Sequence, residues 1–242
     1  MGVRRGQRWI LRPAAFGIAG GVVGLAGPPG VGKTTLLSTF ATLRRPQVGA
    51  LEILGYDTRV PAELRSVRAR LGYLPDDLSW AASLRVSDFV AYAAYYKRTP
   101  AAAVDAVLAR MDLRDVASME LGMLPADIRL RAGLAATCVH EPEIVLLDEP
   151  LSGIDDDTVD LWPLIRSLAP TVLLTTSATE RLTGRCDRVL TLARGRLMML
   201  PAEPAPPGRA GPRPATAAHA SAATPRRAYA TAPRPSRIGA GV

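Results

Sequence analysis

The chain has 242 residues, of which 48% are hydrophobic and 5% are aromatic. This composition fits one large α/β domain with an aliphatic core and excludes a wholly disordered chain. The net charge of +8 is carried by the two ends, residues 1–12 with four Arg and residues 201–242 with six Arg against one Glu. Because the body between the ends is nearly neutral, the charge pattern argues against a nucleic-acid-binding face on the domain itself.

Short apolar segments flanked by turn residues predict β-strands, the first of them broken by glycine turns. These segments are residues 8–26, 49–54, 71–74, 144–147, 171–175 and 189–192. Helices are expected at residues 33–44, 61–70 and 160–167, and turns or loops at residues 55–57 and 75–79. Buried strands that alternate with helices imply an α/β fold with a parallel sheet.

Residues 86–140 differ from the rest, because they are rich in Ala and favour helix, with breaks at Pro100 and Pro125. We predict a helical subdomain, about residues 76–140, inserted into the α/β core. After residue 200 the composition is dominated by Pro, Ala, Arg, Gly, Ser and Thr, which cannot bury enough apolar surface to offset chain entropy. The expected organisation is one domain at residues 1–200 and a disordered tail at residues 201–242.

The N-terminal arginines are followed by an uncharged segment, residues 13–32, which superficially matches an export signal or a membrane span. Its seven glycines would strongly destabilise a helix, and no other apolar run reaches about 18 residues. We expect a chain that does not cross a membrane unaided.

A glycine-rich segment between an apolar strand and a helix matches the pattern G-x-x-x-x-G-K-[ST]. Glycines let backbone N–H groups surround phosphate oxygens, and the N-terminus of the following helix adds a partial positive charge. Lys33 would neutralise the β- and γ-phosphates of ATP, and the Thr34 hydroxyl would bind Mg²⁺. The predicted phosphate-binding residues are Gly27, Pro28, Pro29, Gly30, Val31, Gly32, Lys33, Thr34 and Thr35.

A run of aliphatic residues at 144–147 ends in two carboxylates, Asp148 and Glu149. A buried strand that brings Asp148 beside the phosphate loop would supply a second group for Mg²⁺. Glu149 faces the other way and is placed to orient a water molecule as a general base. On its own the pattern is equally compatible with an exposed acidic turn, and the phosphate loop upstream favours the site.

Four fragments together resemble the ATP-binding-cassette (ABC) ATPases of membrane transporters. Residues 27–35 are similar to their GPNGAGKTT loop, and residues 147–155 to their LDEPtsGLD stretch. Residues 71–75 resemble the strand that enters the family's glutamine loop. Residues 186–189, with 195–197, resemble its closing cDrv…Grl pattern. The combination is far more specific than a phosphate loop alone.

The resemblance runs in order from about residue 8 to residue 200. It implies a P-loop NTPase parallel-sheet core with N-terminal antiparallel strands and an inserted α-helical subdomain. Two subunits of this family bind head to tail and enclose two ATP molecules, each under the partner's LSGGQ signature. Asp155 would then lie at the dimer seam, and a role as a helix N-cap is equally compatible with its sequence and does not exclude the first. Trp9 is a candidate for the aromatic that stacks on adenine, with an edge-of-core position as the alternative.

Three parts of the chain depart from the family pattern. The signature is degenerate and consists of Leu124, Pro125, Ala126, Asp127 and Ile128. Pro125 lacks an N–H, and Asp127 puts a carboxylate where the family offers glycine amides to a phosphate. Asp76 replaces the glutamine and would reach Mg²⁺ with a shorter side chain. Ser177 stands at the position of the switch histidine, whose positive charge a hydroxyl cannot carry.

We therefore expect an ATPase subunit with weak hydrolysis that works through a separate membrane-spanning transporter subunit, with ATP and Mg²⁺ as cofactors. A heterodimer with a second ABC ATP-binding subunit is favoured over a homodimer, and the expected location is the cytoplasmic face of the cell membrane. A non-hydrolysing regulatory cassette protein is the alternative. The basic tail suggests nucleic acid as a third partner, but it offers one aromatic residue, Tyr229, and no specific nucleic acid is expected.

Overall fold

A computed structural model describes residues 1–154 and 161–200 of the chain. Its strands are β1 (Val3–Arg5), β2 (Arg8–Leu11), β3 (Gly21–Ala26), β4 (Glu52–Ile53), β5 (Tyr56–Asp57), β6 (Leu71–Leu74), β7 (Ile144–Leu147), β8 (Thr171–Thr176), β9 (Arg188–Ala193) and β10 (Arg196–Met199). The α-helices are α1 (Lys33–Phe40), α2 (Pro61–Ala69), α3 (Val86–Lys97), α4 (Ala102–Arg110), α5 (Ala126–Cys138) and α6 (Trp162–Arg166). Short 3₁₀ turns lie at Ser79–Ala81, Arg114–Val116, Leu121–Met123 and Thr179–Arg181.

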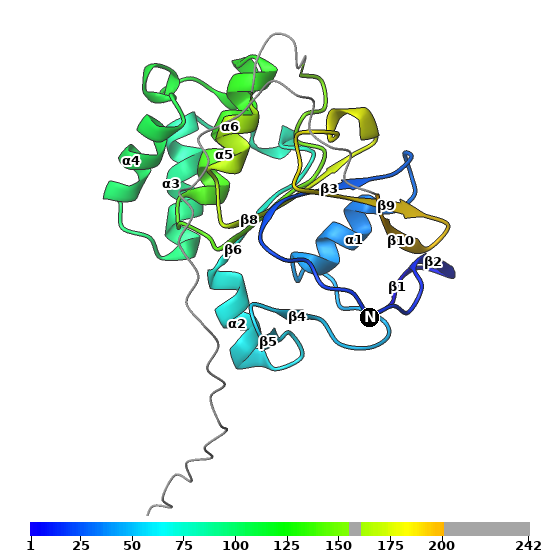
Figure 1. The fold of residues 1–242 in the computed structure, drawn as a ribbon. Coiled ribbons are helices and arrows are strands. Elements are labelled where there is room, and N and C mark those ends of the chain that lie inside the picture. Colours follow the sequence, from blue (N-terminus) through cyan, green and yellow to red (C-terminus); the bar gives the residue numbers. More distant parts are fainter. Residues whose placement is uncertain (155–160, 201–242) are drawn as a thin grey trace, which may run out of the picture. The chain divides into compact units, whose positions relative to one another are not determined.

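Six strands form a central sheet in the order β10-β9-β3-β8-β7-β6 (Figure 1). All neighbouring strands run parallel except the edge strand β10, which pairs antiparallel with β9. Two small antiparallel pairs, β1-β2 and β4-β5, stand apart from this sheet. The predicted α/β core with N-terminal antiparallel strands is confirmed.

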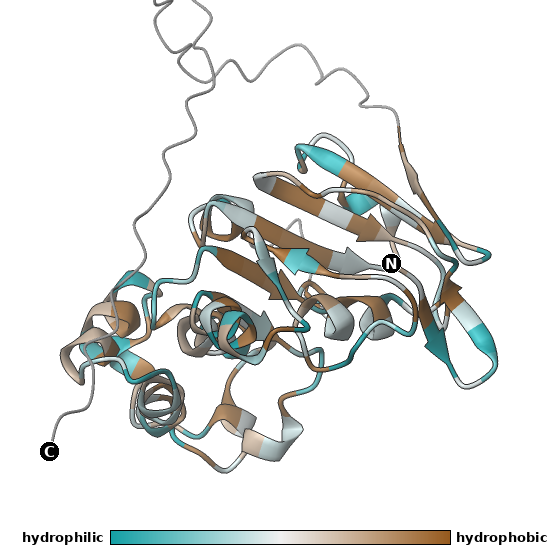
Figure 2. Ribbon diagram, turned by 90° about the horizontal axis from the view of Figure 1, so that it is seen from below, coloured by the Kyte–Doolittle hydropathy of each residue, from teal (hydrophilic) through white to brown (hydrophobic). Residues whose placement is uncertain are grey.

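The sheet is buried on both faces, which explains the nearly continuous apolar sequences of its strands (Figure 2). Side chains alternate between the faces along each strand. In β7, Val145 and Leu147 join the core under the helices, whereas Leu146 joins the core shared with α1. In β8, Leu174 joins the core under the helices and Leu173 joins the core shared with α1.

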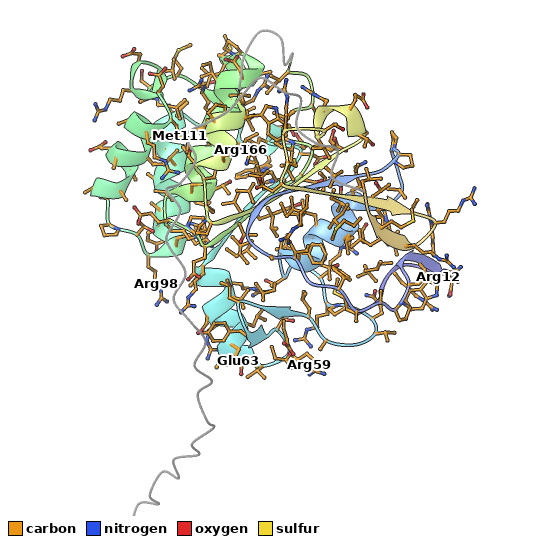
Figure 3. All side chains as sticks on the ribbon, viewed as in Figure 1. Arg12, Arg59, Glu63, Arg98, Met111 and Arg166 are labelled. Atoms are coloured by element: carbon orange, nitrogen blue, oxygen red, sulfur yellow. The ribbon has the colours of Figure 1, made fainter. Side chains whose placement is uncertain are left out.

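Helices α3, α4 and α5 follow β6 and precede β7, so they are an insertion between two neighbouring strands of the sheet (Figure 1). They pack on one another, and Met111 at the end of α4 is fully buried among them (Figure 3). Arg98, in contrast, follows α3 in the left-handed conformation and ends that helix. The inserted helical subdomain expected from the Ala-rich segment is therefore present.

Several boundaries differ from the expectations. The first helix, expected at residues 33–44, ends at Phe40, and Thr42 has a positive φ of 61°. No strand forms between β2 and β3, because Pro13 and the glycines that follow it interrupt the chain. The expected turn at residues 55–57 contains strand β5, and the antiparallel edge strand β10 was not predicted. The helix expected at 160–167 is described only as α6, since residue 160 lies outside the described part.

Candidate functional site

The residues singled out in the sequence meet at one edge of the central sheet, where its parallel strands end. The phosphate loop, residues 27–35, follows β3, and Asp76 lies two residues beyond β6. Asp148 and Glu149 follow β7, and Ser177 follows β8. In open α/β sheets ligands bind outside the carboxyl ends of the strands, so this edge is the expected place for a site.

The phosphate loop has the backbone of an anion site. Gly30 and Gly32 have φ values of 72° and 112°, which only glycine adopts without strain. The N–H groups of these two glycines and of Lys33, Thr34 and Thr35 donate to no described residue. Free amides at the N-terminus of α1, an eight-residue helix, are the arrangement that binds phosphate groups.

The ammonium of Lys33 is buried and held between the phosphate loop and the acidic strand end. It donates to the Gly27 carbonyl oxygen at 2.8 Å and pairs with Glu149 Oε1 at 3.0 Å. The other oxygen, Glu149 Oε2, accepts the Ser177 amide at 3.2 Å. Glu149 itself has φ 44°, a left-handed backbone that non-glycine residues rarely adopt and that is often found at functional sites.

Asp148 is fully buried, and its two carboxylate oxygens have different surroundings. Oδ1 accepts the hydroxyls of Thr175 at 2.7 Å and of Thr34 at 3.3 Å, while Oδ2 has no hydrogen-bond partner among the described residues. Burial raises the pKa of Asp148, and the two hydroxyls oppose that shift. A buried carboxylate oxygen left free beside the Thr34 hydroxyl fits a hard cation such as Mg²⁺.

A cavity of about 250 Å³ borders these carboxylates. Asp76 lines it together with Asp148 and Glu149, and so do Ala126 and Arg129 at the start of α5. The structure therefore brings the substitute for the family's glutamine to the same cavity as the acidic strand end.

The degenerate signature forms the start of α5 and the residues before it. Leu124 is buried, and Pro125 precedes the first helical residue, Ala126. Asp127 lies in the first turn, where a carboxylate is favourable next to the helix dipole, and Ile128 packs against the core under the helices. The substitutions thus preserve the helix while removing the hydroxyl and glycines of the family pattern.

Trp9 is not brought to the phosphate loop. The guanidinium of Arg4 lies 3.8 Å from the centre of its ring, and a Cβ added at Gly2 would meet the ring at 3.0 Å. Its neighbours point to the other side of β2: a Cβ at Gly32 would meet Ile10 at 2.6 Å, and Arg8 Nη1 donates to the Gly30 carbonyl at 3.3 Å. Because adjacent residues of a strand point to opposite faces, a Trp9 that faces away from the loop would have indicated that Arg8 faces toward it.

Sequence reasoning also missed Thr175, whose hydroxyl contacts both acidic residues. No motif marks this position, and only its place in β8 next to the end of β7 reveals it. The predicted dimer-seam residue Asp155 lies outside the described residues.

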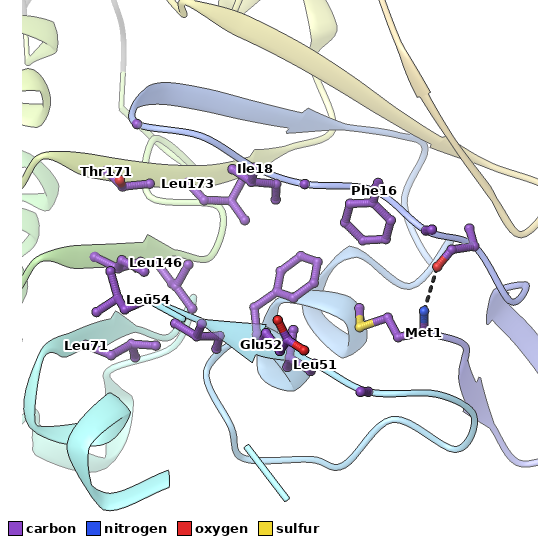
Figure 4. A pocket seen from close by; sticks show the side chains of 18 residues that line it. Met1, Phe16, Ile18, Leu51, Glu52, Leu54, Leu71, Leu146, Thr171 and Leu173 are labelled. Carbon is purple, nitrogen blue, oxygen red and sulfur yellow. Dashed lines mark hydrogen bonds between the residues drawn. The ribbon is translucent and has the colours of Figure 1, made fainter. Parts of the chain in front are cut away.

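A second cavity, of about 590 Å³, lies between residues 14–18, residues 50–54 and the sheet (Figure 4). Its lining is mostly aliphatic and aromatic, with Glu52 as its one charged side chain. The amino group of Met1 donates to the Ala14 carbonyl at its rim. Neither cavity is lined by a residue of the phosphate loop, and the smaller one is the candidate site because Asp76, Asp148 and Glu149 line it.

No helix in the described ranges is long and apolar enough to span a membrane. The same ranges contain no group of three or more His, Cys, Asp or Glu side chains that could hold a metal ion by themselves.

Comparison with known proteins gives the family. Residues 16–152 match the family described as ABC transporter. The chain is 34% identical over 206 residues to "Daunorubicin resistance ATP-binding protein DrrA3" of Streptomyces coeruleorubidus, covering 81% of this chain and 64% of that protein. It is 32% identical over 203 residues to "Nod factor export ATP-binding protein I" of Burkholderia lata, covering 80% and 66%. The matched part of the chain thus spans just under two thirds of the length of these relatives.

Two solved structures share the fold. The "ATP binding subunit of ABC transporter" has a TM-score of 0.69 at 20% identity, with 82% of this chain and 87% of that chain covered. The cbiO1 protein of Clostridium perfringens, part of the ABC transporter complex cbiONQ, has a TM-score of 0.66 at 24% identity, with 78% and 80% covered. The chain belongs to the ATP-binding subunits of the ABC transporter family.

Proposed function

We propose that this chain binds MgATP at the phosphate loop and hydrolyses it slowly, as the motor subunit of a transporter whose membrane-spanning part is a separate protein. The observation that carries the proposal is the convergence of Lys33, Thr34, Asp148 and Glu149 beside five free backbone amides. Phosphoryl transfer needs little covalent chemistry from a protein beyond positioning and charge stabilisation, and this arrangement can supply both.

Each group has a role in that reaction. The free amides would bind the β- and γ-phosphate oxygens, and Lys33 would move from Glu149 to the same oxygens. Thr34 and Asp148 would hold Mg²⁺, which neutralises charge on the phosphates when bound. Glu149, released from Lys33, would accept a proton from the attacking water.

Two substitutions support slow hydrolysis. The Ser177 hydroxyl carries no positive charge to offer the γ-phosphate and is shorter than a histidine, although the Ser177 backbone amide contacts Glu149. Asp127 would place a second negative charge near the partner's nucleotide, and like charges ~4 Å apart repel by about 4 kcal/mol at an intermediate dielectric. Because a homodimer would repeat the defect in both sites, we propose a heterodimer with a second ATP-binding subunit, with Asp155 at the seam.

The helical subdomain offers a surface for the membrane-spanning partner. Trp80 is 62% exposed, and Tyr92, Tyr95 and Tyr96 project from α3 with Tyr95 at 77%. Exposed aromatic clusters of this kind mark interaction sites. Docking there would hold the chain at the cytoplasmic face of the membrane as a peripheral subunit.

Steady-state turnover of the purified chain tests the proposal. We expect a rate well below the ~10 s⁻¹ typical of enzymes. Glu149→Gln should lower that rate by about 100-fold, because it removes a general base. Glu143→Gln is the matched control, since that residue makes only a half-exposed surface ion pair with Arg70. A rate near 10 s⁻¹ for the chain alone would contradict slow hydrolysis.

A non-hydrolysing regulator is the second candidate, and the serine at position 177 favours it. In that case MgATP would drive association of subunits without turnover. Sedimentation velocity with MgATP, together with a transport assay in cells, separates the two. Loss of transport in Glu149→Gln supports the motor, whereas unchanged transport supports the regulator.

A further inference from the structure

The geometry points to Thr175 as a positioning residue that sets the orientation of both acidic groups at the end of β7. One buried hydroxyl connects the proposed magnesium-binding residue, Asp148, to the proposed general base, Glu149. This inference rests on the proposed function, because it assigns a role within that same site.

The hydrogen bonds of Thr175 fix the direction of its hydroxyl. The side chain is fully buried near the end of β8, where Leu174, the preceding residue, pairs with Leu147. Its hydroxyl accepts the Glu149 amide at 2.9 Å and lies 2.7 Å from Asp148 Oδ1. Because an amide can only donate and a hydroxyl has a single proton, that proton is donated to the carboxylate.

For Asp148 the consequence is that its two carboxylate oxygens have different, fixed roles. Oδ1 is occupied by the hydroxyls of Thr175 and Thr34, which leaves Oδ2 as the free oxygen. Without the Thr175 hydroxyl, the buried carboxylate would keep only the longer bond to Thr34 and could rotate about its side-chain bonds. A ligand oxygen that is not held in place binds a cation more weakly.

For Glu149 the consequence concerns the backbone. A φ of 44° costs energy in a residue other than glycine and persists only where neighbours hold it. The bond from the Glu149 amide to Thr175 is the contact that fixes this peptide group. It turns the side chain back toward Lys33 and the Ser177 amide, which bind its two oxygens.

The neighbouring threonine shows that the role belongs to this position. The Thr176 hydroxyl accepts the Ala178 amide in the following turn, and it contacts neither carboxylate. Adjacent residues of a strand point to opposite faces, so the Thr176 hydroxyl cannot take the place of the Thr175 hydroxyl.

The test measures the affinity of the full chain and its variants for Mn²⁺, which replaces Mg²⁺, in the presence of a non-hydrolysable ATP analogue. Electron paramagnetic resonance detects the bound Mn²⁺. Thr175→Val keeps the shape and removes the hydroxyl, and Thr175→Ser keeps the hydroxyl. Thr137→Val is the matched control, because that buried hydroxyl bonds only the Gly133 carbonyl within α5. Circular dichroism verifies folding, and Thr175→Ala deletes the same hydroxyl if the valine variant does not fold.

We expect Thr175→Val to weaken Mn²⁺ binding by about tenfold, the effect of losing a hydrogen bond to a charged group. Thr175→Ser and Thr137→Val should stay within about twofold of the wild type, as should metal-free binding of the analogue to every variant. Unchanged Mn²⁺ affinity in Thr175→Val, or equal losses in the valine and serine variants, would overturn the inference. Failure of the wild type to bind the analogue at all would instead overturn the proposed function.

Discussion

In the proposed reaction, the ammonium of Lys33 changes partners when a triphosphate binds. It now pairs with Glu149 at 3.0 Å, and the two side chains are 6% and 23% exposed. A charge so far removed from water needs a partner, and the carboxylate provides one before nucleotide arrives. In the proposed reaction the same pairing would keep Glu149 occupied until Lys33 leaves it, which would couple nucleotide binding to release of the base.

This coupling predicts opposite effects of one substitution on affinity and on turnover. Glu149→Gln removes the carboxylate that competes with phosphate for Lys33, so ATP should bind about two- to tenfold more tightly while turnover falls. Titration with a fluorescent ATP analogue measures the affinity, and Glu143→Gln is the control. Weaker nucleotide binding in Glu149→Gln would contradict a competitive role for the pair.

Single residues of the site were predictable where a local motif identifies them. The phosphate loop and the Asp148–Glu149 pair stand next to strands that the apolar pattern locates, and their placement followed from strand ends meeting at one edge. Thr175 and Arg8 were not predictable in this way, because their contacts depend on strand register and on which face of β2 meets the loop. Trp9 illustrates the same limit, since composition alone does not show that Arg4 covers its ring.

At the scale of the elements, strand β6 approaches helix α5 closely at a glycine, Gly72. A Cβ added at Gly72 would lie 2.6 Å from the Thr137 carbonyl oxygen, a backbone atom that cannot move without displacing α5. Gly72→Ala should therefore lower the free energy of unfolding by about 2 kcal/mol. Urea denaturation measures it. Gly17→Ala, where a Cβ meets nothing within 4 Å, should cause no loss, and equal stability of the two variants would contradict the packing.

The C-terminal end of α3 is linked to α2 and β6 by a half-buried ammonium beside a histidine. Lys97 Nζ donates to the carbonyls of Arg68 and Leu71 at 2.7 Å each, and His140 Nε2 lies 3.3 Å from the same Leu71 oxygen. Burial, followed by the charge of Lys97, lowers the pKa of His140 from 6.5 to about 4.

The sign of the resulting pH dependence follows from proton counts. Between pH 6.5 and about 4 the unfolded chain protonates this histidine and the folded chain does not, so stability falls as the pH falls through that window. His140→Gln should remove this component, on the order of 1 kcal/mol because the ring is partly exposed. Thermal unfolding of both proteins from pH 7 to pH 4 measures it, and parallel curves would contradict the assignment.

Elements were predictable in proportion to their burial. The central strands were located to within one or two residues because both of their faces are apolar. The segment between β2 and β3 and the end of α1 were not, because glycine, proline and a positive φ at Thr42 decide them locally. Strand β10 was missed because only one of its four residues, Leu197, packs against the hydrophobic core.

At the scale of the whole molecule, the fold class followed from strands that alternate with helices and from an Ala-rich insertion. The central sheet separates two apolar cores, one under the helices and one around α1, and its carboxyl edge brings four loops together. That edge is polar because the strands end there, and every charged group of the proposed site comes from a loop or helix start next to it. The predicted tail at residues 201–242 lies outside the described residues and stays a prediction.

Calorimetric titration of the full chain with MgATP tests the central claim most directly. The account predicts measurable heat and one-site binding for the wild type, and an affinity at least about tenfold weaker for Lys33→Ala, because a charged contact to phosphate is lost. Absence of heat with the wild type, or identical isotherms for the wild type and Lys33→Ala, would contradict a nucleotide site at this loop.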